Sequence, residues 1–312
     1  MTKRFAMMAS GAILLLAPLA QAQLYSVTKE QLVDLTKQWQ GERFADGRPK
    51  VPDSLIERAK GMSAEEVWSG WNAAPAGGGQ GAGGGRGAGG GGGPAWRNQY
   101  EDGWQILHPK TRLVGRAFTV QFMPSRPDLD AVVNAKGRIS NQTAIDMLQP
   151  GDVLDVDLFG KGENGTIVGD NLFYYVMKAT KNSGMVIDGA IRDLTGIQDM
   201  PMPAYFRKTH PTAIGNVTIT GINIPVRIGN ATVMPGDMVF GDAEGVYFVP
   251  PQFVERIVDA ADEVHIHDEW TRKKFDEGKY KSSEIYSSPR DPALRQEYEE
   301  YKKKRLAEIR KK

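Results

Sequence analysis

An arginine and an aspartate stand side by side at Arg192 and Asp193, shortly after a mostly apolar stretch, Met185 to Asp188. That stretch predicts a short buried strand, and adjacent residues at the end of a strand can reach into one cavity. Arginine presents a planar fork that suits a carboxylate or an enolate oxygen, whereas aspartate is a hard oxygen ligand for Mg²⁺ or Mn²⁺. An isolated Arg-Asp pair is more often a surface ion pair, so this motif needs support from elsewhere in the chain.

Support comes from the segment Gly169-Asp170-Asn171-Leu172, which begins a predicted helix extending to Lys181. The free N–H groups and the dipole at a helix start favour a bound anion. Asp170 could also be an ordinary carboxylate of the first helical turn. It precedes Arg192 by only one helix and one strand, however, so these groups can meet at one edge of a sheet. Together they predict a site for a 2-oxo acid.

Several strands are expected around these motifs. The longest are Leu113 to Met123 and Asp152 to Phe159, and shorter ones punctuated by Gly, Pro and Asn follow at Val217–Ile219, Ile224–Ile228, Met238–Gly241 and Val246–Val249. Few of the predicted strands alternate strictly with helices along the chain, which disfavours a doubly wound nucleotide-binding fold.

Helices are expected on both sides of this core. The first begins near Thr28, with Leu32, Leu35 and Trp39 spaced for one face, and another opens at Ser63. After the core, an apolar stripe follows Pro251 up to a stop at Gly278. The last predicted helix, 292–312, is highly charged, and it is either a solvated helix or one that docks on a neighbouring subunit.

The first 22 residues have the order typical of a secretory signal peptide. A basic start is followed by an apolar run from Ala12 to Leu19, and Ala20 and Ala22 frame a cleavage site before Gln23. The run is too short for a stable membrane span, although a buried N-terminal helix is an alternative. The sequence therefore predicts an exported protein, periplasmic or secreted, and no later stretch predicts a span.

Glycine dominates the stretch Gly77 to Gly93, which indicates a flexible linker because it can bury little apolar surface. A phosphate-binding loop is disfavoured, since no strand precedes it and no helix with Lys-Ser/Thr follows.

Composition excludes several other classes of function. The chain has no cysteine, so thiol nucleophiles, thiolate metal sites and disulfides are absent. Its formal charge is +1, from 39 Lys and Arg against 38 Asp and Glu, which offers no basis for nucleic acid as a partner. A hydrophobic fraction of 40% suits a globular enzyme with a sizeable core.

Four motifs in order, GDVLDVD, GDN-L, GMVIDGAIRD and VMPGDMVFGDAEGVYFVP, resemble the RraA-like family. That family contains class II aldolases acting on 4-hydroxy-4-methyl-2-oxoglutarate and also the regulator of ribonuclease E activity. The resemblance covers about Leu113 to Gly278, and GRAFTVQFMP fits the first core strand.

The resemblance implies an α/β fold, a three-layer β/β/α sandwich of the swivelling-domain type, with an N-terminal helical extension and C-terminal helices. It also implies a homotrimer or a hexamer with sites at subunit boundaries. The chain then divides into a signal peptide (1–22), a helical segment (23–76), a glycine-rich linker (77–94), the RraA-like catalytic domain (95–285) and a charged C-terminal helix (286–312).

The resemblance further assigns roles to individual residues. Asp193 would bind Mg²⁺ or Mn²⁺, Arg192 would bind the substrate carboxylate and carbonyl, and Asp170 would hold a water and help proton transfer. The amides of Gly169, Asn171 and Leu172 would bind the pyruvoyl carboxylate. One residue more separates Asp170 from Arg192 than in the family's aldolases, which leaves Asn171 as an alternative match to Asp170.

An acidic ligand is also expected from the C-terminal helix of a neighbouring subunit. Glu269 in EWTRKKFDEG is the best match, with Asp268 as the alternative. His210 could carry a proton in the site, although a turn histidine before proline is the commoner case. His265 and His267, two apart on a helix, make a poor metal pair.

The predicted function is therefore a metal-dependent lyase that cleaves a 2-oxo acid to pyruvate, as an aldolase or an oxaloacetate decarboxylase. The alternative is a non-catalytic binding or regulatory protein of the RraA type, which the signal peptide and the retained Asp170, Arg192 and Asp193 disfavour. A methyltransferase of quinone biosynthesis is disfavoured because no S-adenosylmethionine fingerprint follows a strand.

Overall fold

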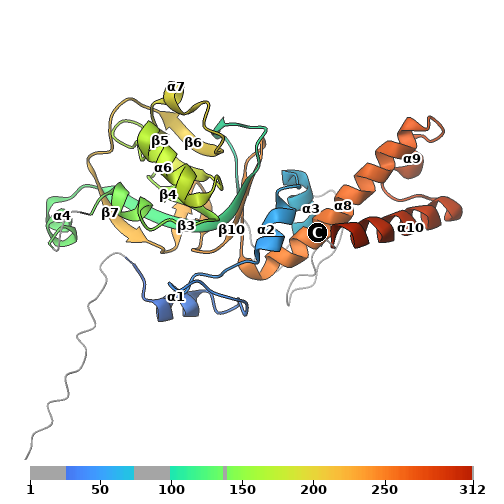
Figure 1. Cartoon of the computed structure of the whole chain (residues 1–312), viewed down its shortest axis with the longest axis horizontal. Helices are drawn as coiled ribbons and strands as arrows, with labels where there is room; N and C mark the ends of the chain where they lie inside the picture. The colour runs from blue at the N-terminus through green and yellow to red at the C-terminus, as the bar shows by residue number, and fades with distance from the viewer. Residues whose placement is uncertain (1–25, 74–98, 136–138, 311–312) are drawn as a thin grey trace, which may run out of the picture.

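A computed structural model describes residues 26–73, 99–135 and 139–310. The predicted signal peptide and the glycine-rich stretch lie outside the described residues. The chain has the expected mixed α/β architecture, in which helices pack around a curled sheet (Figure 1). In the described ranges, no helix combines the length and the apolar character needed to cross a membrane.

Four parallel strands form the centre of the sheet, and they are buried along most of their length because both faces are covered. They are β3 (Leu113–Pro124), β4 (Asp152–Asp157), β5 (Met185–Ile191) and β6 (Ala204–Thr209). Antiparallel strands extend the sheet on either side: β10 (Met238–Gly241), β11 (Val246–Val249) and β1 (Tyr100–Glu101) beyond β3, and β2 (Gln105–Leu107) beyond β6. The strand β7 (Val217–Ile222) also pairs with β3.

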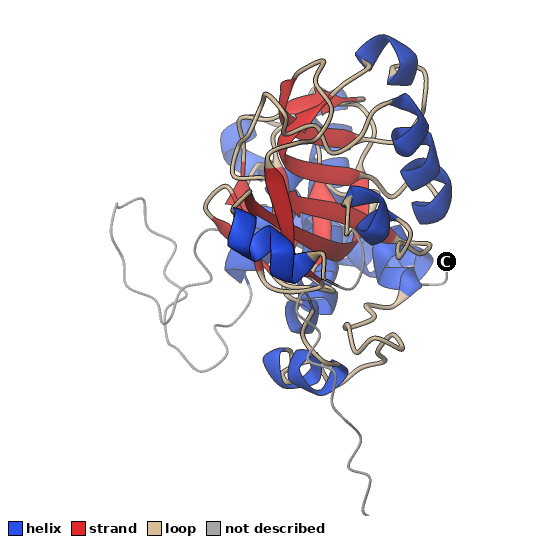
Figure 2. Ribbon diagram, turned by 90° about the vertical axis from the view of Figure 1, so that its left-hand side faces the viewer, coloured by secondary structure: helices blue, strands red, loops and turns tan. Residues whose placement is uncertain are grey.

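Helices cover one face of the central strands and a β-ribbon covers the other. On the helical face Phe173 packs with Phe118 and Val156, and the helices are α4 (Pro127–Val133), α5 (Asn141–Ile145), α6 (Asp170–Thr180) and α7 (Leu194–Ile197). The opposite face holds Val153 and Val186 against the ribbon of β8 (Val226–Ile228) and β9 (Ala231–Val233). Figure 2 shows the strands enclosed by helices from a second direction. The expected three-layer β/β/α arrangement is confirmed.

The N-terminal segment packs onto the core. Its helices are α1 (Lys29–Leu35), α2 (Asp53–Ala59) and α3 (Ala64–Ala73), and the last two contact the long helix α8 (Pro251–Asp276). Arg48 lies fully buried and forms an ion pair of 2.8 Å with the equally buried Asp152 at the start of β4. This segment is therefore joined to the core of the sheet by a buried charge pair as well as by apolar contacts.

The C-terminal helices fold back on their own chain. After α9 (Ser282–Ile285), α10 (Pro292–Ile309) returns along α8, as Figure 1 shows. A small separate core forms there from Trp270, Ile285 and Leu294, with Tyr298 and Tyr301 packed against it. This charged helix was expected either to be solvated or to dock on a neighbouring subunit, whereas its apolar residues pack within its own chain.

Some predicted elements were wrong or missed. The first helix ends at Leu35, which is exposed, and Trp39 lies beyond it, so the predicted stripe has only Leu32 buried. The reason is that Thr36 caps the helix and the chain turns away before Trp39. β5 continues to Ile191 rather than stopping at Asp188, and β6 was not predicted because half of it is polar.

Candidate functional site

The candidate site forms where the end of β5 meets the start of α6. The loop before α6 runs beside β5, with Thr166 opposite Ala190 in a parallel bridge. The amide of Arg192 then donates to the carbonyl of Val168 at 3.2 Å. These backbone contacts bring Gly169 directly against the Arg-Asp pair, although the two motifs are more than twenty residues apart.

Gly169 is buried and has no room for a side chain. A Cβ atom at this position would lie 2.4 Å from Asp193 Oδ2 and 2.7 Å from Arg192 Nε. Both distances are shorter than any real Cβ contact, so one of the two polar side chains would have to move. Glycine is therefore required here by close approach to the functional pair rather than by its backbone angles, which are extended.

The first turn of α6 offers amides to the same place. The amide of Asp170 donates to Asp193 Oδ2 at 3.3 Å, and that of Asn171 donates to the Asp170 side chain at 2.7 Å. The helical ladder begins only with Phe173, whose amide donates to Gly169. For the amide of Leu172, the described residues provide no acceptor. This helix start can thus receive the oxygens of an anion.

Asp193 has an uncommon backbone conformation. Its φ of 61° and ψ of 38° are left-handed, and it caps the short helix α7. Its Oδ2 lies 3.4 Å from Arg192 Nε, and the side chains of Arg192 and Asp193 are 37% and 42% exposed. Left-handed non-glycine residues cost energy and are frequent at functional sites, and Asp is among the types that tolerate this region. The pair is accessible to a ligand.

A bulge in β5 lies just before the pair. The register between β5 and β6 shifts between Ile187 and Ala190, so Asp188 and Gly189 form the irregularity. Arg207 on β6 donates to Asp188 Oδ1 at 2.9 Å, and the amide of Gly229 donates to Oδ2 at 3.2 Å. Bulges bend a strand and re-aim the residues beyond them. The buried Asp188–Arg207 pair, which sequence reasoning missed, therefore holds the strand that ends in the site.

An open cavity of about 270 Å³ lies beside the pair. Arg192, Asp193 and Leu194 line it from the β5 side, and Thr209, His210 and Pro211 line it from the end of β6. His210 follows a strand rather than occupying an isolated surface turn, so its possible part in the site has structural support. The sequence signal that could have predicted this strand is the run of apolar residues at 204–206, which precedes His210.

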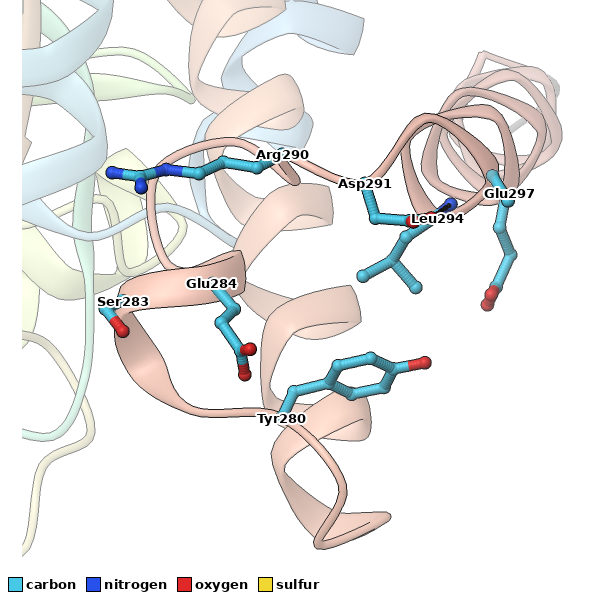
Figure 3. A pocket seen from close by; sticks show the side chains of 8 residues that line it. Tyr280, Ser283, Glu284, Arg290, Asp291, Leu294 and Glu297 are labelled. Carbon is cyan, nitrogen blue, oxygen red and sulfur yellow. Dashed lines mark hydrogen bonds between the residues drawn. The ribbon is translucent and has the colours of Figure 1, made fainter.

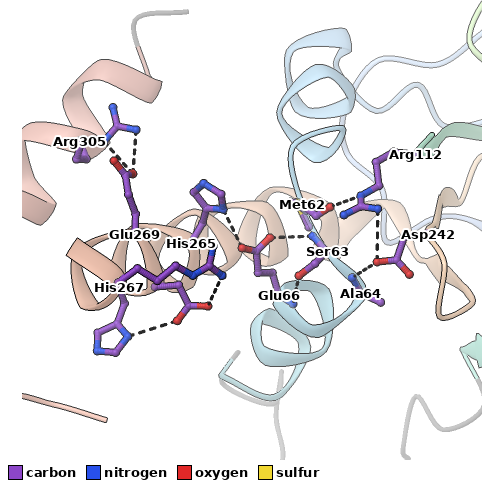
Figure 4. A network of polar contacts seen from close by, with 12 residues as sticks. Met62, Ser63, Ala64, Glu66, Arg112, Asp242, His265, His267, Glu269 and Arg305 are labelled. Atoms are coloured by element: carbon purple, nitrogen blue, oxygen red, sulfur yellow. Dashed lines mark hydrogen bonds and ion pairs between the residues drawn. The ribbon is translucent and has the colours of Figure 1, made fainter. Parts of the chain in front are cut away.

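Glu269 does not lie with these residues within one chain. It sits on α8, where its carboxylate accepts from the Tyr301 hydroxyl at 2.7 Å. It also accepts from Arg305 at 3.0 Å (Figure 4). Burial acts to raise the pKa of Glu269, but these two hydrogen bonds outweigh it and lower the pKa. Only a neighbouring copy could bring this carboxylate to the cavity, and it would first have to leave Arg305.

The residues present suit a water-rich magnesium site. Asp193 and Asp170 offer carboxylates at an accessible position, and Mg²⁺ commonly takes one or two carboxylates while keeping several waters and substrate oxygens. Across the described parts of the chain, no group of three or more His, Cys, Asp or Glu side chains gathers to form a complete cage. The donor set therefore fits a cation that shares its shell with substrate and water.

A larger cavity of about 660 Å³ lies far from this site, between α8, α9 and α10 (Figure 3). Its acidic residues already serve local structure. Glu284 accepts from the amide of Lys281, Asp291 caps α10, and Glu297 pairs with Lys274. The cavity beside Arg192 and Asp193 is therefore the better candidate for the functional site, although its volume is smaller.

Comparisons with known proteins identify the family of this chain. Residues 95–248 match the family model described as RraA-like, Aldolase/RraA, a stretch that contains Gly169, Asp170, Arg192 and Asp193. A relative from Halalkalibacterium halodurans, provisionally named 4-hydroxy-4-methyl-2-oxoglutarate aldolase, is 31% identical over 163 residues, or 52% of this chain and 71% of the relative. The chain belongs to the RraA-like family.

Other RraA-like proteins extend the comparison. A relative from Ectopseudomonas mendocina with the same provisional name is 32% identical over 34% of this chain and 64% of its own length. The crystal structure of Streptomyces coelicolor RraAS2, described as an unusual member of the RNase ES inhibitor RraA family, superposes with a TM-score of 0.55. It is 24% identical and covers 72% of this chain and 98% of its own, so it bears on the fold alone. Proteins of this family thus carry names of two kinds, aldolase and ribonuclease inhibitor.

Proposed function

We propose that this RraA-like protein is a divalent-metal-dependent lyase that cleaves a carbon–carbon bond of a small 2-oxo acid and releases pyruvate. One observation carries the proposal: Gly169 approaches so closely that no side chain can separate the start of α6 from Arg192 and Asp193. A helix N-terminus thereby lies directly against a planar cation and a carboxylate, and these two side chains line an accessible cavity. The aldolase names of the relatives suggest 4-hydroxy-4-methyl-2-oxoglutarate as a substrate. Oxaloacetate is a second candidate, because its decarboxylation passes through the same pyruvate enolate.

Substrate binding would fall to Arg192 and to the first turn of α6. The guanidinium can donate two parallel hydrogen bonds, one to the carboxylate and one to the neighbouring carbonyl oxygen of the 2-oxo acid. The amide of Leu172, and that of Asn171 once it leaves the Asp170 side chain, would donate hydrogen bonds to the remaining carboxylate oxygen at the helix start. The first turn of α6 is part of a regular element, and Arg192 directly follows β5 with its amide bonded to Val168, so the backbone of both groups is held in place before the substrate arrives.

Bond cleavage leaves negative charge on the carbonyl oxygen of the pyruvate unit. A fixed positive charge beside that oxygen stabilises the transition state more than the bound substrate, and Arg192 supplies it. With the aldol substrate, the exposed carboxylate of Asp170 would accept the proton of the C4 hydroxyl as the C3–C4 bond breaks. With either substrate, a proton from water at C3 of the enolate would complete pyruvate.

Asp193 would hold the cation, with Glu269 or Asp268 of a neighbouring copy as a further ligand. When bound, Mg²⁺ or Mn²⁺ supplies Lewis acidity that withdraws electron density from the carbonyl oxygen. We further propose that the protein assembles as a homotrimer or a hexamer and that it acts outside the cytoplasm after removal of residues 1–22.

Release of pyruvate tests the proposal directly. The mature protein would be mixed with oxaloacetate or 4-hydroxy-4-methyl-2-oxoglutarate and Mg²⁺, and pyruvate followed with a lactate dehydrogenase assay. The rate without protein is subtracted, because oxaloacetate loses carbon dioxide unaided. We expect turnover that a chelator abolishes and that Mg²⁺ restores. Absence of turnover on either substrate, or turnover that ignores the chelator, would favour the alternative of a non-catalytic binding or regulatory protein.

A further inference from the structure

His210 lines the same cavity as the Arg-Asp pair, from the end of the neighbouring strand β6, and its backbone is held in place. Its amide donates to the carbonyl of Ile191 at 3.1 Å, which ties it to the residue just before Arg192. Its carbonyl accepts from the Thr166 hydroxyl at 3.3 Å. The position of the imidazole relative to Arg192 is therefore set by contacts with both segments that build the site.

The ring is oriented by Thr212. The amide of Thr212 lies 3.4 Å from Nδ1 of His210, and the Thr212 hydroxyl lies 2.9 Å from the same nitrogen. A backbone amide can only donate, so Nδ1 is an acceptor. The Thr212 hydroxyl already accepts from the amide of Asn164 at 2.7 Å, which leaves its own hydrogen free for Nδ1.

An imidazole whose Nδ1 accepts carries its hydrogen on Nε2 when it is neutral. Among the described residues, Nε2 of His210 has no acceptor, and the side chain is partly exposed where it lines the cavity. The site thus presents two kinds of donor, a charged fork at Arg192 and a single neutral N–H at His210. A donor kept in this tautomer is suited to binding an oxygen rather than to giving a proton away.

We propose that His210 is a specificity-determining residue whose Nε2–H binds an oxygen at the far end of the substrate. Arg192 would hold the 2-oxo acid end, and His210 would select 2-oxo acids that carry a second carboxylate over those that end in a methyl group. This inference rests on the proposed function for the substrate class, but it concerns binding and does not require turnover.

Calorimetric binding with Mg²⁺ present tests it with two stable ligands, 2-oxoglutarate and pyruvate. Only the first has a distal carboxylate. We expect His210→Phe, which keeps a ring but removes the donor, to weaken 2-oxoglutarate roughly 10- to 100-fold, as loss of a hydrogen bond to a charged group does. Pyruvate affinity should change less than about twofold. His210→Gln, which retains an N–H donor, should recover much of the 2-oxoglutarate affinity.

Controls separate this inference from the proposed function. His265→Phe makes the same change on α8, where His265 bonds Glu66 away from the cavity, and it should leave both affinities unchanged. Thermal melting checks that each variant folds. If His210→Phe weakens both ligands equally, or neither, the inference is wrong even when pyruvate release is observed. Wild-type protein that binds 2-oxoglutarate through His210 yet releases no pyruvate would overturn the lyase alone.

Discussion

The Cα atom of Gly169 faces the carboxylate of Asp193 so closely that a methyl group there would lie 2.4 Å from Oδ2. The two residues belong to different elements, because Gly169 is the N-cap of α6 and Asp193 is the N-cap of α7, which follows β5. Their contact brings the N-terminus of α6, Arg192 and Asp193 together in a single site. It therefore offers the most direct test of the site's architecture.

Gly169→Ala should lower both pyruvate release and ligand affinity, because the added methyl group must displace Asp193 or Arg192. Overpacking costs typically 1 to 3 kcal/mol of stability, which a folded core of this size can tolerate. Gly61→Ala is the matched control, since its Cβ would meet the nearest atom, the carbonyl oxygen of Arg58, at an ordinary 3.5 Å. Wild-type rates in Gly169→Ala would show that the close approach has no functional consequence.

Asp193→Asn should abolish metal-dependent turnover and weaken Mg²⁺ binding, because it removes the charge that a hard cation requires. Asparagine tolerates the left-handed backbone of this position, so folding should survive. Titration with Mg²⁺ followed by calorimetry measures the loss. Retention of both metal affinity and rate would remove Asp193 from the metal site.

Arg192→Lys should keep metal binding but lower kcat roughly 10²- to 10³-fold, about the effect of removing one oxyanion-stabilising donor. Lysine retains the positive charge but not the planar fork, so substrate orientation suffers. The comparison of kcat with Mg²⁺ affinity in this one variant distinguishes the two roles. An equal loss of both would assign Arg192 to the structure of the metal site instead.

Stability should fall as the pH rises toward neutrality, because of two buried carboxyl groups. Burial raises the pKa of Asp237 to about 7, and burial together with the neighbouring carboxyl groups of Asp237 and Asp152 raises the pKa of Asp155 well above its usual value. A carboxyl with a higher pKa when folded binds its proton more tightly in the folded state. Its stabilising contribution is complete below the unfolded pKa of about 3.9 and is lost as the pH rises to about 7.

Urea unfolding across this range would measure that loss, which should reach a few kcal/mol, since one pKa unit corresponds to about 1.4 kcal/mol. Asp237→Asn keeps an oxygen for the amide of Met234, which donates to this side chain at 2.8 Å, and cannot ionise. This variant should flatten the pH dependence between about pH 4 and 7. A wild-type protein that became more stable over the same range would contradict the prediction.

Arg48→Met should destabilise the fold by roughly 3 to 5 kcal/mol, because it leaves the fully buried Asp152 without its counter-charge. Lys50→Met is the control, since Lys50 pairs with Glu42 near the surface and should contribute less than about 1 kcal/mol. Chemical unfolding of both variants gives the comparison. If both variants lost the same amount of stability, the buried Arg48–Asp152 pair would stabilise the fold no more than a surface ion pair does.

Mature protein purified from its native source should begin at or near Gln23, given the Ala20-Gln21-Ala22 cleavage motif. Mass spectrometry of the intact protein measures this directly. Recovery of residues 1–22 on protein from the cytoplasm would contradict export.

Local patterns were sufficient for much of the fold. The predicted strands Met238–Gly241 and Val246–Val249 match β10 and β11 residue for residue, and β3 runs one residue beyond its predicted end. Apolar runs bounded by glycine, proline and asparagine carry this information, because burial of both faces requires continuous apolar side chains. The motifs around Gly169 and Arg192 were also visible as candidates, since glycine-acid and Arg-Asp pairs at element boundaries have defined chemistry.

Packing decided what these patterns do not contain. The ion pair of Arg48 with Asp152 joins residues 104 apart, so no local period records it. The half-polar strand β6, which presents Arg207 to the bulge and His210 to the cavity, is indistinguishable from a loop until its neighbour β5 is in place. Chain order predicted that Gly169 and Asp193 could meet at one sheet edge. Only the folded chain shows that they touch, because that distance depends on how α6 packs across the sheet.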